Sequence, residues 1–410
     1  MSSTQKDKTL VLDIASFTKE EVISAALNTA VDLSLPIAIW RMPHQSEIHL
    51  VLSIDDAKKI NSIDLDELKT GFLIAPFQFG KLPAHFIEDD FHLSLDFDEV
   101  INNPSSVENE GNDKLDQIKI TFETYLTRNI KAKHYHLNPK NTDQAPIDYR
   151  HLIEKSVTAI IDRQFDKVVP ARSKNIEIPD DFSPVDLLID LCTSYPNAFV
   201  SFVSIPKIGT WIGATPEILI EKADNTFKTI ALAGTQNVDP LKPISDTSWT
   251  EKEIEEQAMV SRYIINCFKK IRLREYEEVG PKTVQAGNLL HLKTTYAVNT
   301  IDTNFDELAT VMLNLLHPTS AVAGMPKESA MDFLNQFEKL NREFFSGFLG
   351  PVNLENSTNL FVNLRCMQLL DNQARLYAGA GVTLDSDPEK EYQETEMKFK
   401  TMLDVVNRQL

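Results

Sequence analysis

Short apolar runs that recur in close pairs constrain the fold of this chain more than any other feature of its sequence. AFVSFVSI and TWIGATPEILI follow one another closely, and FKTIALAG comes soon afterwards. Such runs between turn-forming residues predict buried strands. Their close spacing favours hairpins over regular βαβ units, and neither a GxGxxG motif nor a P-loop is present. The sequence therefore predicts a mixed α/β (α+β) fold with an antiparallel or mixed sheet core, rather than a Rossmann fold.

The chain divides into two parts at about residue 117. Residues 1–117 form an N-terminal part in which PIAIWRMP, IHLVLSI and GFLIAPF predict short buried strands. Residues 100–115 are polar and acidic and predict an exposed, mobile loop. Residues 118–410 alternate helical segments such as DYRHLIEKSVTAIIDR with strand-like runs such as KVVPARSK, and all the candidate chemistry lies there.

Charge and cysteine content exclude several classes of function. The 410 residues include 60 acidic and 41 basic side chains, a formal charge of -19 that repels nucleic acid and anionic membrane surfaces. Cys192, Cys267 and Cys366 are widely separated, which fits a reducing cytosol better than a disulfide framework. No run approaches the roughly 18 apolar residues that a membrane span needs. We expect a cytoplasmic enzyme.

Two pairs of glutamates predict a metal site. Glu253 and Glu256, and likewise Glu391 and Glu394, stand three residues apart in helix-patterned segments, so each pair shares one helix face. Mg²⁺ prefers oxygen ligands and keeps several waters, so two direct carboxylates would suffice. A solvated acidic face is the alternative for either pair alone.

A glycine-rich turn precedes the second glutamate pair. Gly379, Ala380 and Gly381 permit close backbone approach and left-handed angles, which would let successive N–H groups converge on a carboxylate. An ordinary hairpin corner is the alternative. Arg365 and Tyr377 lie in strand-like surroundings, where they could bind a carboxylate or form a buried structural pair.

Lys167 in FDKVVPARS and Glu217 in GATPEIL are candidates for a general base and a general acid. A lysine base needs a lowered pKa and a glutamic acid donor a raised one, and burial can produce both shifts. Each residue taken alone also fits an ordinary surface charge.

Many ordered blocks together resemble one known family. They are KVVPAR, WIGATPE, ALAGTQ, KEIEEQAMV, LLHLKT, LHPTSAVAGMP, FFSGFLGPV and LYAGAGVTLDSDPEKEYQETEMK. From about Lys155 to Leu410 the chain resembles the chorismate-utilising enzymes, which include isochorismate synthase, salicylate synthase, anthranilate synthase component I and aminodeoxychorismate synthase. The resemblance implies the two-lobed α/β domain of anthranilate synthase component I.

The resemblance also implies a role for each candidate residue. Mg²⁺ would be held by Glu256 and Glu394, with Glu253 and Glu391 as outer or water-mediated carboxylates, and would receive the ring carboxylate of chorismate. The turn of Gly379, Ala380 and Gly381, with Lys398, would bind the ring carboxylate. Arg365 and Tyr377 would bind the enolpyruvyl carboxylate. Thr235 and His291 would lie at the leaving-group side of the ring.

Lys167 and Ala321 narrow the implied reaction. Ammonia-using anthranilate synthases usually carry glutamine at the position of Lys167, so a lysine favours water as nucleophile. Lys167 would take a proton from water attacking ring carbon 2, and Glu217 would protonate the hydroxyl leaving carbon 4, which gives isochorismate. Ala321 stands where relatives with lyase activity tend to carry a hydroxyl residue, and its small apolar side chain would leave a second elimination, that of pyruvate, unsupported. Salicylate synthase and the aminating enzymes of the family are the alternatives.

No amidotransferase partner is expected, and relatives that act alone are often monomers. The use of the product for menaquinone, a siderophore or salicylate stays open. The chain departs from the family pattern at Pro170, which predicts an edge or bulge beside Lys167, and at Gln257, which would alter support of the metal.

Overall fold

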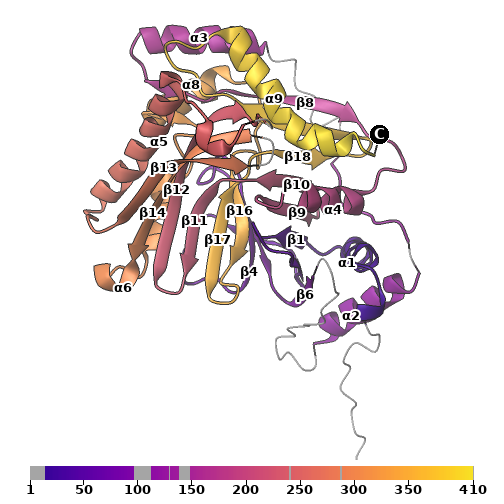
Figure 1. Cartoon of the computed structure of the whole chain (residues 1–410). Helices are drawn as coiled ribbons and strands as arrows, with labels where there is room; N and C mark the ends of the chain where they lie inside the picture. The colour runs from indigo at the N-terminus through magenta and orange to yellow at the C-terminus, as the bar shows by residue number, and fades with distance from the viewer. Residues whose placement is uncertain are drawn as a thin grey trace, which may run out of the picture.

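Two antiparallel sheets lie face to face in the part of the chain that the computed structural model describes, residues 14–96, 112–128, 130–137, 148–239, 242–286 and 289–409. Helices cover the outer face of each sheet (Figure 1). Strand pairs such as β9 with β10 and β18 with β19 are antiparallel hairpins, as the spacing of the apolar runs predicts. The expected mixed α/β architecture is confirmed.

Within the described ranges, the first sheet has eight strands. In spatial order they are β6 (Phe91–Leu95), β2 (Ile48–Leu52), β1 (Ile37–Arg41), β9 (Phe199–Ile205), β10 (Gly209–Thr215), β18 (Cys366–Leu369), β19 (Gln373–Gly379) and β8 (Ala171–Glu177).

The second sheet has nine strands in the same ranges. Their order is β13 (Glu277–Ala286), β14 (Leu289–Asn299), β12 (Thr226–Asn237), β11 (Ile218–Ala223), β17 (Ser357–Val362), β16 (Phe348–Val352), β4 (Gly71–Ala75), β5 (Ala84–Glu88) and β3 (Lys58–Ile60).

Central strands are buried on both faces because the sheets form the inner layers of the molecule. In β1, Ile37 and Ile39 pack toward helices, whereas Ala38 and Trp40 pack between the sheets. Successive side chains of a strand point to opposite faces, so a strand between two apolar layers must be apolar throughout. This explains the unbroken apolar runs PIAIWRMP and GFLIAPF, whose predicted strands are confirmed as β1 and β4.

Two groups of helices cover the sheets. Helices α1 (Lys19–Leu33), α2 (Asp113–Leu126), α4 (Pro184–Ser194) and α9 (Pro388–Val406) pack on the first sheet. Helices α3 (Tyr149–Ile161), α5 (Glu251–Lys270), α7 (Leu308–Leu316) and α8 (Lys327–Phe337) pack on the second. Shorter helical turns are η1 (Ile14–Ser16), η3 (Ile244–Asp246) and α6 (Thr300–Thr303). No helix in the described ranges has the length and apolar character of a membrane span.

A two-stranded ribbon of β7 (Lys167–Val168) and β15 (Gly324–Met325) joins the layers. Pro170 separates β7 from β8, because proline lacks the N–H group that a continuous strand would use. The expected edge or bulge beside Lys167 takes the form of a gap between two strands, the second of which, β8, is the edge strand of the first sheet.

The N-terminal part belongs to the same fold as the rest of the chain. Its strands β1, β2 and β6 join the first sheet, and β3, β4 and β5 join the second. The division at residue 117 falls inside α2, which also contains residues 113–115 of the predicted loop, so the loop prediction is wrong there. The side chain of Asn112 accepts a hydrogen bond from the Lys114 N–H and begins the helix. Residues 100–111 of the predicted loop lie outside the described residues.

Candidate active site

Lys167 and Glu256 form an ion pair between β7 and α5. Lys167 Nζ lies 2.8 Å from Glu256 Oε1, and the lysine side chain is only 1% exposed. Burial would raise the pKa of Glu256, but the charges of Lys167, Lys398 and Lys252 together outweigh burial and lower it to about 2. The predicted base and a predicted metal ligand therefore contact one another in this structure.

Glu217 lies in the buried corner between β10 and β11. Burial raises its pKa to about 7, although the positive charges of Lys167, Arg365 and Lys398 oppose the shift. A carboxyl group with this pKa is partly protonated at neutral pH. It can donate a proton to a leaving group, as the sequence predicts for this residue.

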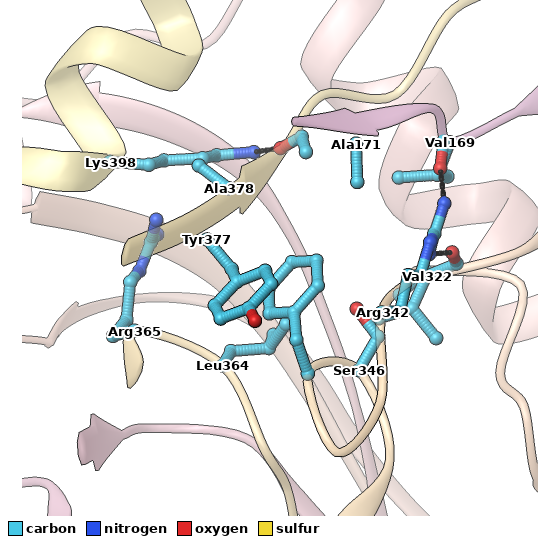
Figure 2. A pocket seen from close by; sticks show the side chains of 13 residues that line it. Val169, Ala171, Val322, Arg342, Ser346, Leu364, Arg365, Tyr377, Ala378 and Lys398 are labelled. Carbon is cyan, nitrogen blue, oxygen red and sulfur yellow. Dashed lines mark hydrogen bonds between the residues drawn. The ribbon is translucent and has the colours of Figure 1, made fainter. Parts of the chain in front are cut away.

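A pocket adjoins these residues, with about 430 Å³ of empty volume that is partly open to solvent. Arg365, Tyr377 and Lys398 lie on one side of it, and Val322 and Arg342 lie on the other (Figure 2). Gly379 and Ala321 also line it. Arg365 and Lys398 also act electrostatically on Glu217, so the carboxyl group is near this pocket although it is not among the lining residues.

Arg365 directly precedes β18 and has a left-handed backbone, with φ of 48°. Such a conformation costs a non-glycine residue roughly 1–2 kcal/mol. Burial lowers the pKa of Arg365 to about 10, against the raising effect of Glu394 and Glu217, so the guanidinium remains charged at neutral pH. It is suited to binding an anion in the pocket.

The Tyr377 ring is stacked between two aromatic side chains. Its centroid lies 5.3 Å from that of Trp211 and 5.4 Å from that of Phe345. Burial raises the pKa of the Tyr377 hydroxyl, which keeps it protonated. The stacking fixes the ring at the pocket wall, where its hydroxyl can act as a hydrogen-bond donor.

His291 lies on β14 and is held in one tautomer. Its Nδ1 is 2.7 Å from the Gly234 carbonyl oxygen, which can only accept, so Nδ1 carries the proton. Burial, with Arg365 second, lowers the His291 pKa to about 4, so the ring is neutral. Thr235 follows Gly234 at a β-bulge between Ala233 and Gln236, and is half-buried.

The glycine-rich turn differs from its expected form. Gly379 and Gly381 are absent from the glycines with positive φ, and the Ala380 N–H lies 3.3 Å from the Pro170 carbonyl oxygen and 3.2 Å from the Tyr149 hydroxyl. The expected set of left-handed, converging N–H groups is therefore wrong. The reason is that β19 still pairs with β8 as far as Gly379, which keeps the backbone extended.

Gly381 lies close against the buried ion pair of Lys167 and Glu256. A Cβ atom there would lie 2.8 Å from Glu256 Oε1 and 2.9 Å from Lys167 Cε. The Gly379 carbonyl oxygen accepts a hydrogen bond of 2.8 Å from Lys398 Nζ (Figure 2). The turn thus contacts the buried ion pair on one side and the pocket lysine on the other.

The remaining predicted metal ligands have protein partners. Glu394 Oε1 lies 2.6 Å from Lys398 Nζ, and Glu391 Oε1 lies 2.8 Å from Lys252 Nζ. Glu253 accepts a hydrogen bond from the Thr250 N–H at the start of α5, in a capping box. No group of three or more His, Cys, Asp or Glu side chains in the described ranges is arranged as a metal site.

Lys252 pairs with Glu391 and is close enough to Glu394 and Glu256 for their charges to act on it. Burial would lower its pKa, but Glu391, Glu394 and Glu256 raise it overall. Carboxylate oxygens gathered around a positive charge are the donor set that Mg²⁺ prefers. The residues therefore fit a divalent cation, with Glu253 the least suited because it caps a helix. Gln257 donates to the Ala231 carbonyl and to Thr294 and so supports the second sheet.

Comparison with known proteins decides the family. The sequence profile of chorismate binding enzymes matches residues 88–407. This chain belongs to that family. Isochorismate synthase EntC of Escherichia coli K12 is 29% identical over 262 residues, which span 63% of this chain and 66% of EntC, just under two thirds. Isochorismate synthase DhbC of Bacillus subtilis is 29% identical over 281 residues, 66% of this chain and 69% of DhbC.

A solved structure of a family member confirms the fold. The menaquinone-specific isochorismate synthase MenF from Escherichia coli superposes with a TM-score of 0.71 at 20% identity, covering 95% of this chain and 92% of MenF. The family resemblance predicted from the sequence blocks is confirmed, and so is the mixed α/β fold with an antiparallel sheet core that it implies.

The sequence analysis did not predict several residues that hold or pair with the candidate site residues of this chain, or that lie beside the pocket. Trp211 and Phe345 hold Tyr377, Lys252 pairs with Glu391, and Glu338 pairs with Arg342 beside the pocket. Phe345 lies in the block FFSGFLGPV, which carried part of the resemblance, so that block held a signal. Lys252 likewise precedes the first glutamate pair within KEIEEQAMV.

Proposed function

We propose that this chain is an isochorismate synthase, which isomerises chorismate to isochorismate. The observation that carries the proposal is that Lys167 and Glu217 are both buried, and that the Lys167 charge acts on Glu217, whose pKa burial raises to about 7. A lysine and a protonatable carboxyl group beside one anion-binding pocket supply the base and the acid of a water exchange. The relatives named isochorismate synthase support the same reaction.

In the proposed reaction, Lys167 takes a proton from water as its oxygen bonds to ring carbon 2. The ring double bonds shift, and the bond from carbon 4 to its hydroxyl oxygen breaks as Glu217 donates a proton to it. Substrate and product are isomers, so the same groups with exchanged roles catalyse the reverse reaction. Lys167 must leave Glu256 and be neutral before it can accept the proton.

Two cationic anchors hold the substrate in the proposed complex. Arg365, helped by the Tyr377 hydroxyl, binds the enolpyruvyl carboxylate, and Lys398 binds near the ring carboxylate. Thr235 and His291 lie beside the leaving group. Fixing both ends of the ring orients it between acid and base, an effect worth about 7–11 kcal/mol in favourable cases.

Magnesium is the proposed cofactor. Glu256 and Glu394 would hold the ion, with Glu391 and Glu253 as outer or water-mediated carboxylates. When bound, Mg²⁺ would neutralise the ring carboxylate of the substrate. In the structure these three carboxylates, Glu256, Glu394 and Glu391, pair with Lys167, Lys398 and Lys252 respectively.

One assay tests the proposed function. Purified protein is incubated with chorismate, with and without Mg²⁺ and with ammonium in a parallel tube, and the products are separated by chromatography. Isochorismate that requires Mg²⁺ and is indifferent to ammonium supports the proposal. Salicylate with pyruvate, or an aminated product, would assign the chain to another activity of the family.

Ala321 gives a sharper test of product choice. We expect Ala321→Thr to increase pyruvate release from isochorismate, because a hydroxyl group at the pocket wall can support the second elimination. Pyruvate is measured by a coupled dehydrogenase assay, with Ala321→Val as a control of similar size. An equal pyruvate rate in both variants contradicts this role.

A further inference from the structure

The segment that carries Lys167 leaves backbone groups without strand partners. Pro170 separates β7 from β8, so the Val169 carbonyl and the Ala171 N–H lie on either side of a break in the sheet. Buried backbone polar groups need hydrogen-bond partners, and an unpaired one costs about 1–3 kcal/mol. The partners of these two groups are side chains from a distant segment.

Glu338 and Arg342 supply those partners. Arg342 Nη2 donates to the Val169 carbonyl oxygen at 2.7 Å, and Glu338 Oε2 accepts from the Ala171 N–H at 2.8 Å. Arg342 Nη1 also donates to the Val322 carbonyl oxygen at 3.0 Å, directly after Ala321. One pair of side chains therefore connects both sides of the Pro170 break to the opposite wall of the pocket.

The pair is rigid and buried. Arg342 Nε lies 2.6 Å from Glu338 Oε1 and Nη2 lies 2.8 Å from Oε2, a two-point contact between side chains that are 3% and 4% exposed. The guanidinium lies 4.2 Å from the centre of the Phe77 ring. Planar two-point pairing fixes orientation in a way that a lysine ammonium cannot reproduce.

The contacts of Arg342 distinguish it from the substrate anchors. Figure 2 shows its guanidinium between Val169 and Val322, across the pocket from Arg365 and Lys398. Its donors already serve two backbone carbonyls and a carboxylate. Little hydrogen-bonding capacity remains for a ligand, although the residue lines the pocket.

We propose that the Glu338–Arg342 pair is a positioning device, which holds the Lys167 segment against the Ala321–Val322 wall and so sets the place of the base in the pocket. The proposal rests on the proposed function for its kinetic consequence, while its structural consequence stands independently. Loss of the pair moves Lys167 rather than a substrate contact. The effect therefore falls on kcat and not on KM.

Arg342→Lys is the main test, and Arg41→Lys is its matched control. Arg41 is another buried arginine that binds backbone carbonyls, including those of Tyr195 and Ala198, and none of its partners lines the pocket. We expect Arg342→Lys to lower kcat by about 10- to 100-fold, as a displacement near 1 Å can, with KM changed less than about twofold. Arg41→Lys lowers stability and leaves kcat unchanged.

Amide hydrogen exchange in the peptide covering residues 165–173 gives a readout without substrate. Exchange becomes faster in Arg342→Lys and stays at the wild-type rate in Arg41→Lys. Unchanged exchange in Arg342→Lys overturns the proposal even if the wild-type protein does not isomerise chorismate, an outcome that would reject the proposed function alone.

Three kinetic results would also overturn the proposal. They are an intact kcat in Arg342→Lys, a loss confined to KM, and an equal loss of kcat in Arg41→Lys. If Arg342→Lys does not fold, the uncharged double variant Glu338→Leu/Arg342→Met replaces it, because apolar pairs often substitute for buried ion pairs without loss of stability. A folded double variant that keeps the wild-type kcat and the wild-type rate of amide hydrogen exchange in residues 165–173 rules out the positioning role of the pair.

Discussion

The buried acid Glu217 makes the site sensitive to pH. Its pKa rises from 4.5 to about 7 on folding, mainly through burial. Because the folded state favours the protonated form of Glu217, this residue contributes to stability only while its carboxyl group is protonated. The contribution is full below pH 4.5 and is lost as the pH rises to about 7, a loss of roughly 3 kcal/mol for a shift of this size.

We predict that Glu217→Gln removes this loss. Urea unfolding at pH 5 and pH 8 should show a smaller drop in stability for the variant than for the wild type, because glutamine does not ionise. The wild-type kcat/KM should also decline above about pH 7 as the acid loses its proton. Equal pH dependence of stability in both proteins would show that Glu217 ionises without cost.

Lys167 should be essential for turnover. We predict that Lys167→Ala lowers kcat by about 100- to 10,000-fold, the usual contribution of a general base, measured by isochorismate formation. Lys174→Ala is the control, because Lys174 pairs with Glu396 on the outside of β8 and is 38% exposed. Comparable turnover of the two variants would place the base elsewhere.

At the residue scale, sequence identified the charged groups and missed their pairing. Lys167 and Glu256 were both predicted as site residues, yet the ion pair between them depends on the distance between β7 and α5. Glu394 and Lys398 pair within α9, four residues apart, a spacing that the sequence itself shows. Side chains in distant elements meet only after the sheets are packed. The roles predicted for these residues stay predictions.

At the scale of elements, strand prediction succeeded where both faces of a strand are apolar. The prediction of left-handed backbone angles failed at the turn of residues 379–381, because glycine permits such angles without requiring them. Glu338 gave no signal either, since a buried carboxylate at the end of α8 has the same sequence appearance as an exposed one.

The ribbon of β7 and β15 depends on Gly324. A Cβ atom there would lie 2.2 Å from the Lys167 carbonyl oxygen, and φ is 137°. We predict that Gly324→Ala destabilises the protein by more than about 2 kcal/mol and lowers kcat, because both backbone strain and a clash with backbone arise.

Gly80→Ala is the control for this prediction. Gly80 also has a positive φ, of 96°, but a Cβ atom there would meet nothing within 4 Å. We expect it to cost only about 1–2 kcal/mol from backbone strain, with kcat unchanged. Urea unfolding and steady-state kinetics compare the two variants. Equal effects would exclude the contact with Lys167 as the cause.

At the scale of the whole molecule, neither sheet is complete without the N-terminal part. We predict that a chain of residues 118–410 does not fold, since β9 would lose its partner β1 and β16 would lose β4. Exposed apolar strand edges promote aggregation. Soluble yield and cooperative thermal unfolding measure this, with the full chain as the control. A soluble, cooperative fragment would contradict the interdependence.

The pairing of β4 with β16 also governs when this protein can become active during its synthesis. The last residue of β4, Ala75, precedes the first residue of β16, Phe348, by 273 positions. At about 5–20 residues per second, a ribosome needs about 14–55 s to make the intervening chain. Through that interval the nascent polypeptide carries an apolar strand that can pair with β5 on one side but lacks β16 on the other. Assembly of the second sheet is therefore a late event, which makes the early segments natural clients of chaperones that bind exposed apolar strands.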